Sequence, residues 1–122
     1  MQQTGFCDDL LFGLSHGIKA ALAGCRFVRR HARLPGQWAA TPVFVIGSGP
    51  SLDKDIDFIR AHQHQALIVA CGTAVDALYC AGVQPDLYCC TERDQAQAQL
   101  LSYIPDREFL RRMVCVGSEV LH

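Results

Sequence analysis

The sequence predicts an α/β fold in which a parallel sheet of about four strands alternates with helices and is preceded by a helical segment. Four short apolar runs that favour strands recur along residues 42–122. Segments with apolar residues at helical spacing separate these runs, and this alternating order is typical of parallel sheets. A glycine-rich turn directly after the first run indicates the strand–loop–helix connection of a Rossmann-like three-layer sandwich.

The first expected helix spans residues 5–24. Its apolar residues recur three or four positions apart, as on one face of a helix: Leu11, Leu14, Ile18, Leu22 and Cys25. Asp8 or Asp9 can cap its N-terminus. His16 falls near the apolar stripe, where a hydrogen-bonded core histidine is more common than a catalytic one.

Four arginines follow at spacings that place them on one face of a helix: Arg26, Arg29, Arg30 and Arg33. One interpretation is a solvated face, and the other is a surface for an acidic partner or a phosphate group. Residues 37–41 then connect to the first strand. We therefore divide the chain into an N-terminal helical segment, residues 1–41, and a Rossmann-like nucleotide-binding domain, residues 42–122.

Charge and composition argue against several classes of protein. A net charge of −1 disfavours a general nucleic-acid binder, and no apolar run reaches the roughly 18 residues of a membrane span. The N-terminus lacks the basic start and apolar core of a signal peptide, so a cytoplasmic location is expected. With 122 residues and 50% hydrophobic content, the chain has enough apolar residues to form a core.

The seven cysteines are expected to be structural. Four of them fall inside expected strands, where they would serve as small buried apolar residues: Cys71, Cys89, Cys90 and Cys115. Cys89 and Cys90 are adjacent and must point to opposite faces of the sheet. Together with the odd count and the lack of any C-x-x-C pair, this pattern disfavours both disulfides and a zinc site.

The first strand, residues 43–46, leads directly into the turn Gly47-Ser48-Gly49-Pro50-Ser51. The two glycines permit positive φ and a close approach of the backbone to a ligand, and the proline has the fixed φ of a first helical residue. Ser51 adds a hydroxyl where the helix begins, and the helix dipole favours an anion there. The turn is thus a candidate phosphate cradle, or else a structural turn without a ligand.

The residues around this turn exclude two common nucleotide motifs. The dinucleotide-binding fingerprint has a third glycine where Leu52 stands. The Walker loop needs a Gly-Lys-Ser/Thr sequence, which the chain lacks. The site is therefore expected to be neither a standard NAD site nor a P-loop.

A second strand, residues 66–71, ends in the turn Gly72-Thr73. Thr73 is a natural N-cap for the helix that follows and ends at Gly82. The carboxyl ends of parallel strands meet at one edge of a sheet, and ligands of open parallel sheets bind at that edge. Gly72 and Thr73 are therefore expected to lie beside the cradle.

A third strand, residues 86–91, brings Glu92-Arg93-Asp94 to the same edge. This cluster could hold ribose hydroxyls, a metal or a substrate amine, whereas Asp94 is also a suitable N-cap for the next helix. Asp86, which follows a proline, is expected to start the strand. A fourth strand at residues 113–117 follows a short basic turn, and because it would leave one sheet edge uncovered, we expect the domain to be truncated at its C-terminus.

Three segments resemble the MptE-like family in order and spacing: residues 42–53, Ala70-Cys71-Gly72-Thr73-Ala74 and Ala81-Gly82-Val83-Gln84-Pro85-Asp86. This family includes archaeal 6-hydroxymethylpterin diphosphokinases and bacterial motility-associated factors, which look like flagellin glycosyltransferases for sialic-acid-like sugars. Phe6-Cys7-Asp8-Asp9 followed by Gly13-Leu14-Ser15-His16 resembles the helix before the domain in the motility-associated branch, with Cys7 in place of an expected aromatic residue. The glycine-rich turn is also similar to the CMP-binding turn of bacterial sialyltransferases.

The resemblance implies the nucleotide-binding part of a motility-associated glycosyltransferase, with a CMP-type nucleotide-sugar as donor and flagellin as acceptor. The residues implied in binding the donor phosphate, ribose and base are Gly47, Ser48, Gly49, Pro50, Ser51, Gly72, Thr73 and Glu92. Such a transfer demands no metal. By analogy with sialyltransferases, the catalytic base is expected to lie outside this chain. The implied protein binds neither nucleic acid nor a membrane.

Two alternatives remain open. A diphosphokinase would move pyrophosphate from ATP to a pterin alcohol and would need Mg²⁺. Carboxylates at the rim would have to hold that ion, and the candidates are Asp53, Glu92 and Asp94. The other alternative is a non-catalytic fragment or binding module.

Overall fold

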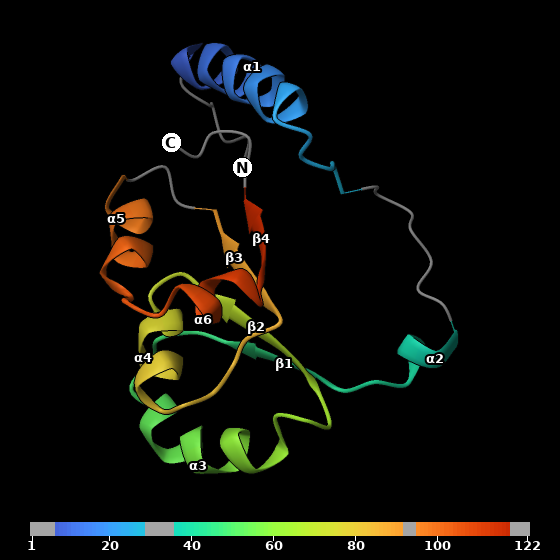
Figure 1. Ribbon diagram of the computed structural model, residues 1–122, viewed down its shortest axis with the longest axis vertical. Helices are drawn as coiled ribbons and strands as arrows, with labels where there is room; N and C mark the ends of the chain where they lie inside the picture. The colour runs from blue at the N-terminus through green and yellow to red at the C-terminus, as the bar shows by residue number, and fades with distance from the viewer. Residues whose placement is uncertain (1–6, 29–35, 92–94, 118–122) are drawn as a thin grey trace.

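The computed structural model describes residues 7–28, 36–91 and 95–117 of the chain. Helices α1 (Cys7–Leu22) and α2 (Gly36–Ala39) precede a parallel sheet (Figure 1). Its strands are β1 (Val43–Ile46), β2 (Leu67–Cys71), β3 (Leu87–Cys90) and β4 (Val114–Gly117). Between them lie α3 (Leu52–His62), α4 (Ala74–Cys80), α5 (Gln95–Tyr103) and α6 (Arg107–Arg111). The predicted α/β class, the four-stranded parallel sheet and the preceding helix are confirmed.

The strands lie in sequence order, β1-β2-β3-β4, and each neighbouring pair is parallel. Crossovers between parallel strands are right-handed, so a sheet whose strand order never reverses has all its connections on one face. The helices α3, α4, α5 and α6 accordingly lie on the same face of the sheet (Figure 1). We call this the helix-covered face.

The hydrophobic core lies between the helix-covered face and these four helices. The strand residues that point into it are Phe44, Ile46, Ile68, Ala70, Tyr88 and Cys90. The helices and the segments that flank them contribute Leu52, Ile59, Val75, Leu78, Ile104 and Phe109. The apolar stripes predicted for the segments of α3, α4 and α5 therefore point inward, as expected from their spacing.

The opposite face of the sheet, here called the open face, carries the alternate residue of each strand. These residues are Val43, Val45, Leu67, Val69, Cys71, Leu87, Cys89, Val114 and Val116. Every one is a valine, a leucine or a cysteine, and Val45 leaves 70% of its surface exposed. Apart from the end of β4, which faces α1 across a cavity, no helix of the described residues packs on this face.

The N-terminal segment departs from the sequence-based expectation. Helix α1 begins at Cys7, so Asp8 and Asp9 lie in its first turn and not at its N-cap. Gly24, at φ 81°, ends the helix: its N–H and that of the next residue close back on the last turn at 3.1 and 2.9 Å. Arg26 is consequently not on a helix, and the other three arginines of the predicted face lie outside the described residues.

Two short helices replace segments that were expected to be connectors. Helix α2 falls within the expected linker to β1. Helix α6 occupies the expected basic turn because Asp106 caps it: Oδ1 accepts the N–H groups of Glu108 and Phe109 at 2.9 and 3.1 Å. Within the described part of the chain, no helix combines the length and the hydropathy needed to cross a bilayer.

Candidate functional site

The candidate site lies at the carboxyl end of β1, where residues 47–51 connect the strand to α3. The Leu52 N–H donates to the Gly49 carbonyl at 2.9 Å, and the Lys54 N–H donates to the Ser51 carbonyl at 3.0 Å, so the turn winds directly into the helix. Ser51 occupies the N-cap position, and its side chain makes no capping hydrogen bond. The hydroxyl therefore lies at the mouth of an 11-residue helix without serving that helix as a cap.

The two glycines of the turn leave space next to the backbone because they have no side chain. Positive φ among the described glycines occurs at Gly24, Gly72 and Gly82, so Gly47 and Gly49 do not use the positive φ that glycine permits. A Cβ added at Gly47 would meet no atom within 4 Å, and one at Gly49 would meet only Ser51 Oγ, at 3.9 Å. The space above the turn is open, so a ligand could approach the backbone.

A second loop meets this turn. The Thr73 hydroxyl donates a hydrogen bond to Ser48 Oγ at 2.6 Å. The two strands that carry these residues are neighbours, with Ile46 paired to Ala70, so their loops leave the sheet at the same edge. Gly72, at φ 55°, turns the chain there while its N–H donates to the Cys89 carbonyl at 3.1 Å. The expected proximity of this loop to the turn is confirmed.

The capping role predicted for Thr73 is wrong. The residue stands at the N-cap position of α4, but its side chain makes no capping hydrogen bond. Its hydroxyl is directed to Ser48 instead. A single threonine hydroxyl has one proton to donate, and here that proton joins the two loops of the candidate site.

The acidic residues expected at the rim are only partly described. Glu92 and Asp94 lie outside the described residues, so their predicted roles stay predictions. Asp53 is exposed in the first turn of α3, next to the glycine-rich turn. In the described ranges, no group of three or more histidine, cysteine, aspartate or glutamate residues is placed to hold a metal ion.

The segment Ala81–Asp86, which carries part of the family resemblance, serves the opposite edge of the sheet. Gly82, at φ 69°, ends α4 as predicted, with its N–H donating to the Tyr79 carbonyl at 3.1 Å. The Asp86 carboxylate accepts the Ile68 N–H at 2.8 Å, at the start of β2. Asp86 thus begins its strand, as expected, and belongs to the amino edge, away from the candidate site.

Gln84 is a structural residue that the sequence did not single out. Its side chain donates to the carbonyls of Pro85 and Phe109, both at 3.1 Å, and its N–H donates to Gln63 Oε1 at 3.2 Å. It therefore joins Gln63, at the end of α3, to Phe109 of α6. The residues next to Gln84 in the sequence, a valine and a proline, do not indicate these bonds, because the partners are 21 and 25 positions away.

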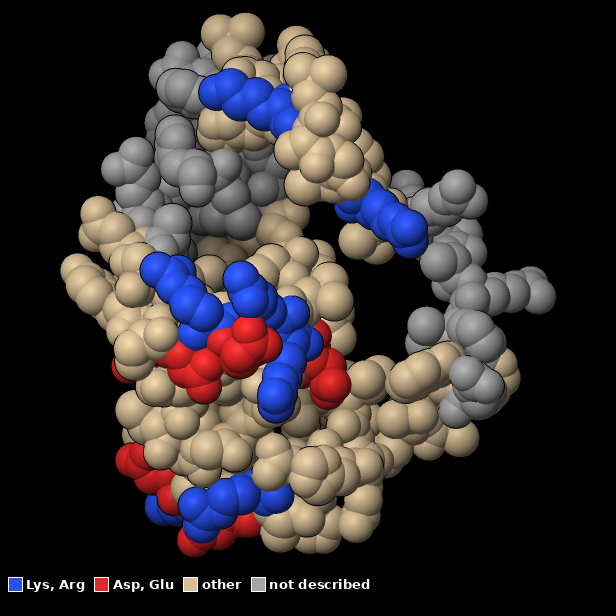
Figure 2. All heavy atoms as spheres, viewed as in Figure 1, with Lys and Arg blue, Asp and Glu red and all other residues tan. Residues whose placement is uncertain are grey.

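Charges on the visible face of the molecule are mixed in sign. In Figure 2 most lysines and arginines gather with aspartates and glutamates in two groups, over α6 and over α3, and two separate blue areas lie over α1 and the segment that follows it. Exposed ion pairs join Arg111 to Glu108 and Arg60 to Asp57. Such exposed pairs contribute little and cancel at a distance, so we assign these two pairs no part in anion binding. The backbone N–H groups of the turn and the α3 dipole favour an anion at the candidate site.

The cysteines of the strands differ in their burial. Cys90 is buried in the core, Cys71 and Cys89 are half-buried on the open face, and Cys115 is exposed. The expectation of a buried cysteine is therefore wrong for Cys115, because β4 is the last strand of the described sheet and nothing pairs with its outer side. Burial raises the pKa of the Cys71 thiol, and its register partner Cys89 raises it further.

Comparisons with known proteins agree with this architecture. A family model described as 6-hydroxymethylpterin diphosphokinase MptE-like matches residues 24–122. A protein of Treponema pallidum (strain Nichols), described as uncharacterized, is 38% identical over 72 residues, which are 58% of this chain and 34% of that protein.

A solved structure is also similar, the MAf glycosyltransferase from Magnetospirillum magneticum AMB-1. It is 38% identical in sequence and superimposes with a TM-score of 0.61, covering 66% of this chain and 13% of that one. The present chain therefore spans about a third of the length of its curated relative and a smaller part of the glycosyltransferase.

Proposed function

The chain belongs to the 6-hydroxymethylpterin diphosphokinase MptE-like family, in its motility-associated factor branch, and we propose that it forms the nucleotide-binding part of a glycosyltransferase. The donor we propose is a CMP-activated, sialic-acid-like sugar, and the acceptor is flagellin. The resemblance of the glycine-rich turn to a CMP-binding turn supports the nucleotide. The similarity to the MAf glycosyltransferase supports the class of reaction.

The observation that carries the proposal is the hydrogen bond from Thr73 to Ser48, 2.6 Å long. It joins the loops after β1 and β2 at the carboxyl edge of the sheet, where open parallel sheets bind their ligands. One of these two hydroxyls belongs to Ser48, between Gly47 and Gly49, next to which the described residues leave open space. Phosphate oxygens need donors of this kind, namely hydroxyls and backbone N–H groups at the start of a helix.

The chemistry assigns a defined task to this turn. When the sugar moves from the donor to an acceptor hydroxyl, the bond between sugar and phosphate breaks, and the nucleotide leaves with the bonding electrons as a phosphate anion. Backbone N–H groups and the α3 dipole would stabilise the negative charge that develops on that leaving group. The proton of the acceptor hydroxyl must go to a base, and we assign no described residue to that role.

A diphosphokinase activity is the second candidate, favoured by the family to which the chain belongs and by the position of Asp53 beside the turn. Transfer of pyrophosphate from ATP requires Mg²⁺ between the phosphates and protein carboxylates. Asp53 would be one ligand, and Glu92 and Asp94 would be the others. This candidate therefore predicts a nucleotide response that depends on magnesium.

The test is a thermal-shift titration of the whole chain with CMP without metal, and separately with ATP and Mg²⁺. A ligand that binds only the folded state at about 100 times its Kd adds roughly 2.7 kcal/mol to the free energy of unfolding. We expect CMP alone to raise the melting temperature. A response confined to ATP with Mg²⁺ would favour the diphosphokinase, and no response to either would overturn both proposals.

Gly49→Val tests the cradle itself. Its added side chain would occupy the open space above the turn, so we expect the CMP response to disappear while the far-ultraviolet circular dichroism is retained. Gly36→Val in α2 is the matched control, because a side chain there also meets open space and α2 lies apart from the connection between β1 and α3 (Figure 1). If Gly49→Val binds CMP as well as the unchanged chain, the turn is not the phosphate site.

A further inference from the structure

We propose that Thr73 is a positioning residue, which orients the Ser48 hydroxyl for the donor phosphate and does not itself contact the nucleotide. The inference rests on the proposed function, because it concerns the same glycine-rich turn. It divides the implied binding residues into two groups. The turn after β1 binds the phosphate, and the loop after β2 supports that turn.

The protons of the two hydroxyls separate their roles. Each hydroxyl has one proton to donate and can also accept hydrogen bonds. The Thr73 proton is used on Ser48 Oγ, at 2.6 Å, so Ser48 keeps its own proton. The oxygens of an ionised phosphate accept hydrogen bonds. Of these two hydroxyls, the one that can still donate to them is that of Ser48.

The backbone donors of the two loops differ in the same way. The Gly72 N–H donates to the Cys89 carbonyl at 3.1 Å, so it is used within the protein. In the turn after β1, the N–H groups of Ser48, Gly49 and Ser51 donate to no backbone carbonyl of the described residues. These N–H groups lie where α3 begins, and the dipole of that helix favours an anion there.

The hydrogen bond from Thr73 improves Ser48 as a donor. It holds the hydroxyl in place, so less side-chain freedom is lost when the phosphate binds. An accepted hydrogen bond also polarises the hydroxyl and strengthens the bond that this hydroxyl donates. Because the Thr73 side chain makes no capping bond to α4, removing its hydroxyl takes no capping bond from that helix.

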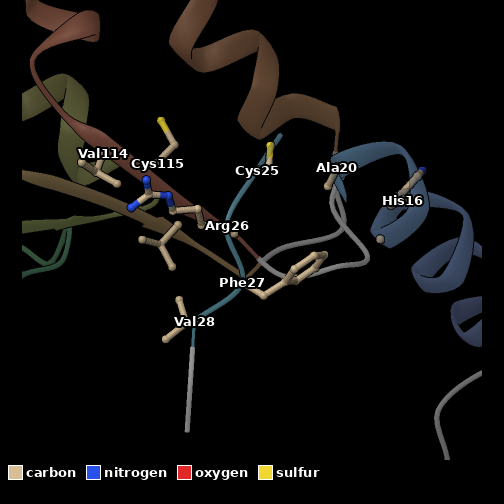
Figure 3. Close-up of a pocket in the computed structure, with 11 residues that line it drawn as sticks. His16, Ala20, Cys25, Arg26, Phe27, Val28, Val114 and Cys115 are labelled. Atoms are coloured by element: carbon tan, nitrogen blue, oxygen red, sulfur yellow. The ribbon is translucent and has the colours of Figure 1, made fainter. Parts of the chain in front are cut away.

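A cavity between α1 and β4 is the competing place for an anion. Arg26 lines this cavity of about 570 Å³ together with Phe27, Val114 and Cys115 (Figure 3). Its guanidinium makes no ion pair within the described residues, and a guanidinium can bind phosphate. Two strands separate β4 from β1, so a substitution of Arg26 tests the cavity without altering the turn.

The test is isothermal titration calorimetry of the whole chain with CMP. We expect Ser48→Ala to raise the Kd about tenfold or more, because it loses a hydrogen bond to a charged group. Thr73→Val removes the other hydroxyl and keeps the shape of the side chain, and we expect it to raise the Kd about threefold to tenfold. Thr73→Ser restores a hydroxyl and should return the Kd close to the wild-type value.

The double variant distinguishes positioning from direct contact. Once residue 48 is alanine, the Thr73 hydroxyl has nothing to orient. We therefore expect Ser48→Ala combined with Thr73→Val to bind CMP within about twofold of Ser48→Ala alone. Two hydroxyls that each contacted the phosphate independently would instead give factors that multiply.

Two variants serve as controls, and both should bind CMP as the wild type does. Ser102→Ala is matched to Ser48→Ala, because it removes an exposed serine hydroxyl whose bond, to the Gln99 carbonyl, lies within α5. Arg26→Gln removes the cation of the cavity. Circular dichroism checks that each variant is folded. If Thr73→Val does not fold, Thr73→Ala at the same exposed position takes its place.

The results separate this inference from the proposed function. A wild-type chain that does not bind CMP would overturn both. If the wild type binds CMP, the inference alone fails in either of two cases: Thr73→Val binds equally well, or the double variant loses the full factor of both substitutions. Loss of binding in Arg26→Gln but not in Ser48→Ala would place the nucleotide in the cavity and would also overturn it.

Discussion

At the residue scale, the role of a polar side chain depends on which of two possible hydrogen-bond partners it takes. The Thr73 hydroxyl could have capped α4, and it donates to Ser48 instead. The choice is made by a residue 25 positions away in the sequence, brought close by the pairing of β1 with β2. Local rules for capping can rank Thr73 as an N-cap, but they contain no information about the neighbouring loop.

Tyr88 provides a prediction at the same scale. It is 4% exposed, its Oη has no nitrogen or oxygen hydrogen-bond partner among the described residues, and burial raises its pKa well above the ordinary value of 10.0. The folded state therefore holds the phenol proton more tightly than the unfolded state. The stability that this phenol contributes is complete below pH 10 and is lost as the pH rises above 10, towards the folded-state pKa.

We expect Tyr88→Phe to lose less melting temperature than the wild type between pH 8 and about pH 11, because phenylalanine has no proton to release. At pH 7 the substitution should change the free energy of unfolding by about 1 kcal/mol or less. Tyr103→Phe is the control, since Tyr103 is 75% exposed. Equal pH slopes for Tyr88→Phe and the wild type would mean that the phenol is not buried.

At the scale of the elements, the two edges of the sheet have separate tasks. The carboxyl edge holds the turn after β1 and the loop after β2, which the bond from Thr73 to Ser48 joins. The amino edge is tied down by Asp86, whose carboxylate bonds to the start of β2 and whose carbonyl accepts the Val114 N–H of β4 at 2.8 Å. One edge is therefore open to a ligand, and the other joins three strands.

This division predicts the effects of Asp86→Ala. The buried Ile68 would lose a charged acceptor for its N–H, so we expect the free energy of unfolding to fall by about 1.5–3 kcal/mol in urea denaturation. Asp86→Asn keeps an oxygen at the same place and should cost less. Asp57→Ala, which breaks an exposed ion pair, should cost about 0–1 kcal/mol.

The melting-temperature response of Asp86→Ala to CMP should equal that of the wild type, because the residue lies at the edge opposite to the glycine-rich turn. A lost response in a variant that is still folded would show that the amino edge contributes to binding.

At the scale of the whole molecule, the strand order decides which surfaces remain exposed. An order without reversal places the connections on one face, so the described helices leave the other face uncovered.

Much of the fold could be predicted from the sequence by itself. Each strand is a continuous apolar run, and each long helix has an apolar stripe at helical spacing, so the local pattern is sufficient for the α/β class, the four strands and the family resemblance. The turn after β1 was also recognisable, because glycines and a proline directly after a buried strand are a local signal.

Only the tertiary structure decided how these elements use their side chains. It placed Thr73 against Ser48, Gln84 against Phe109 and Asp86 against Ile68, contacts that join residues 18 to 25 positions apart. It also ended α1 at Leu22, before Gly24, and left the apolar side chains of that helix, such as Leu14 and Leu22, exposed. Periodicity identifies which residues of an element share a face, but the surface that covers this face depends on strand order and chain crossings, and these are properties of the whole fold.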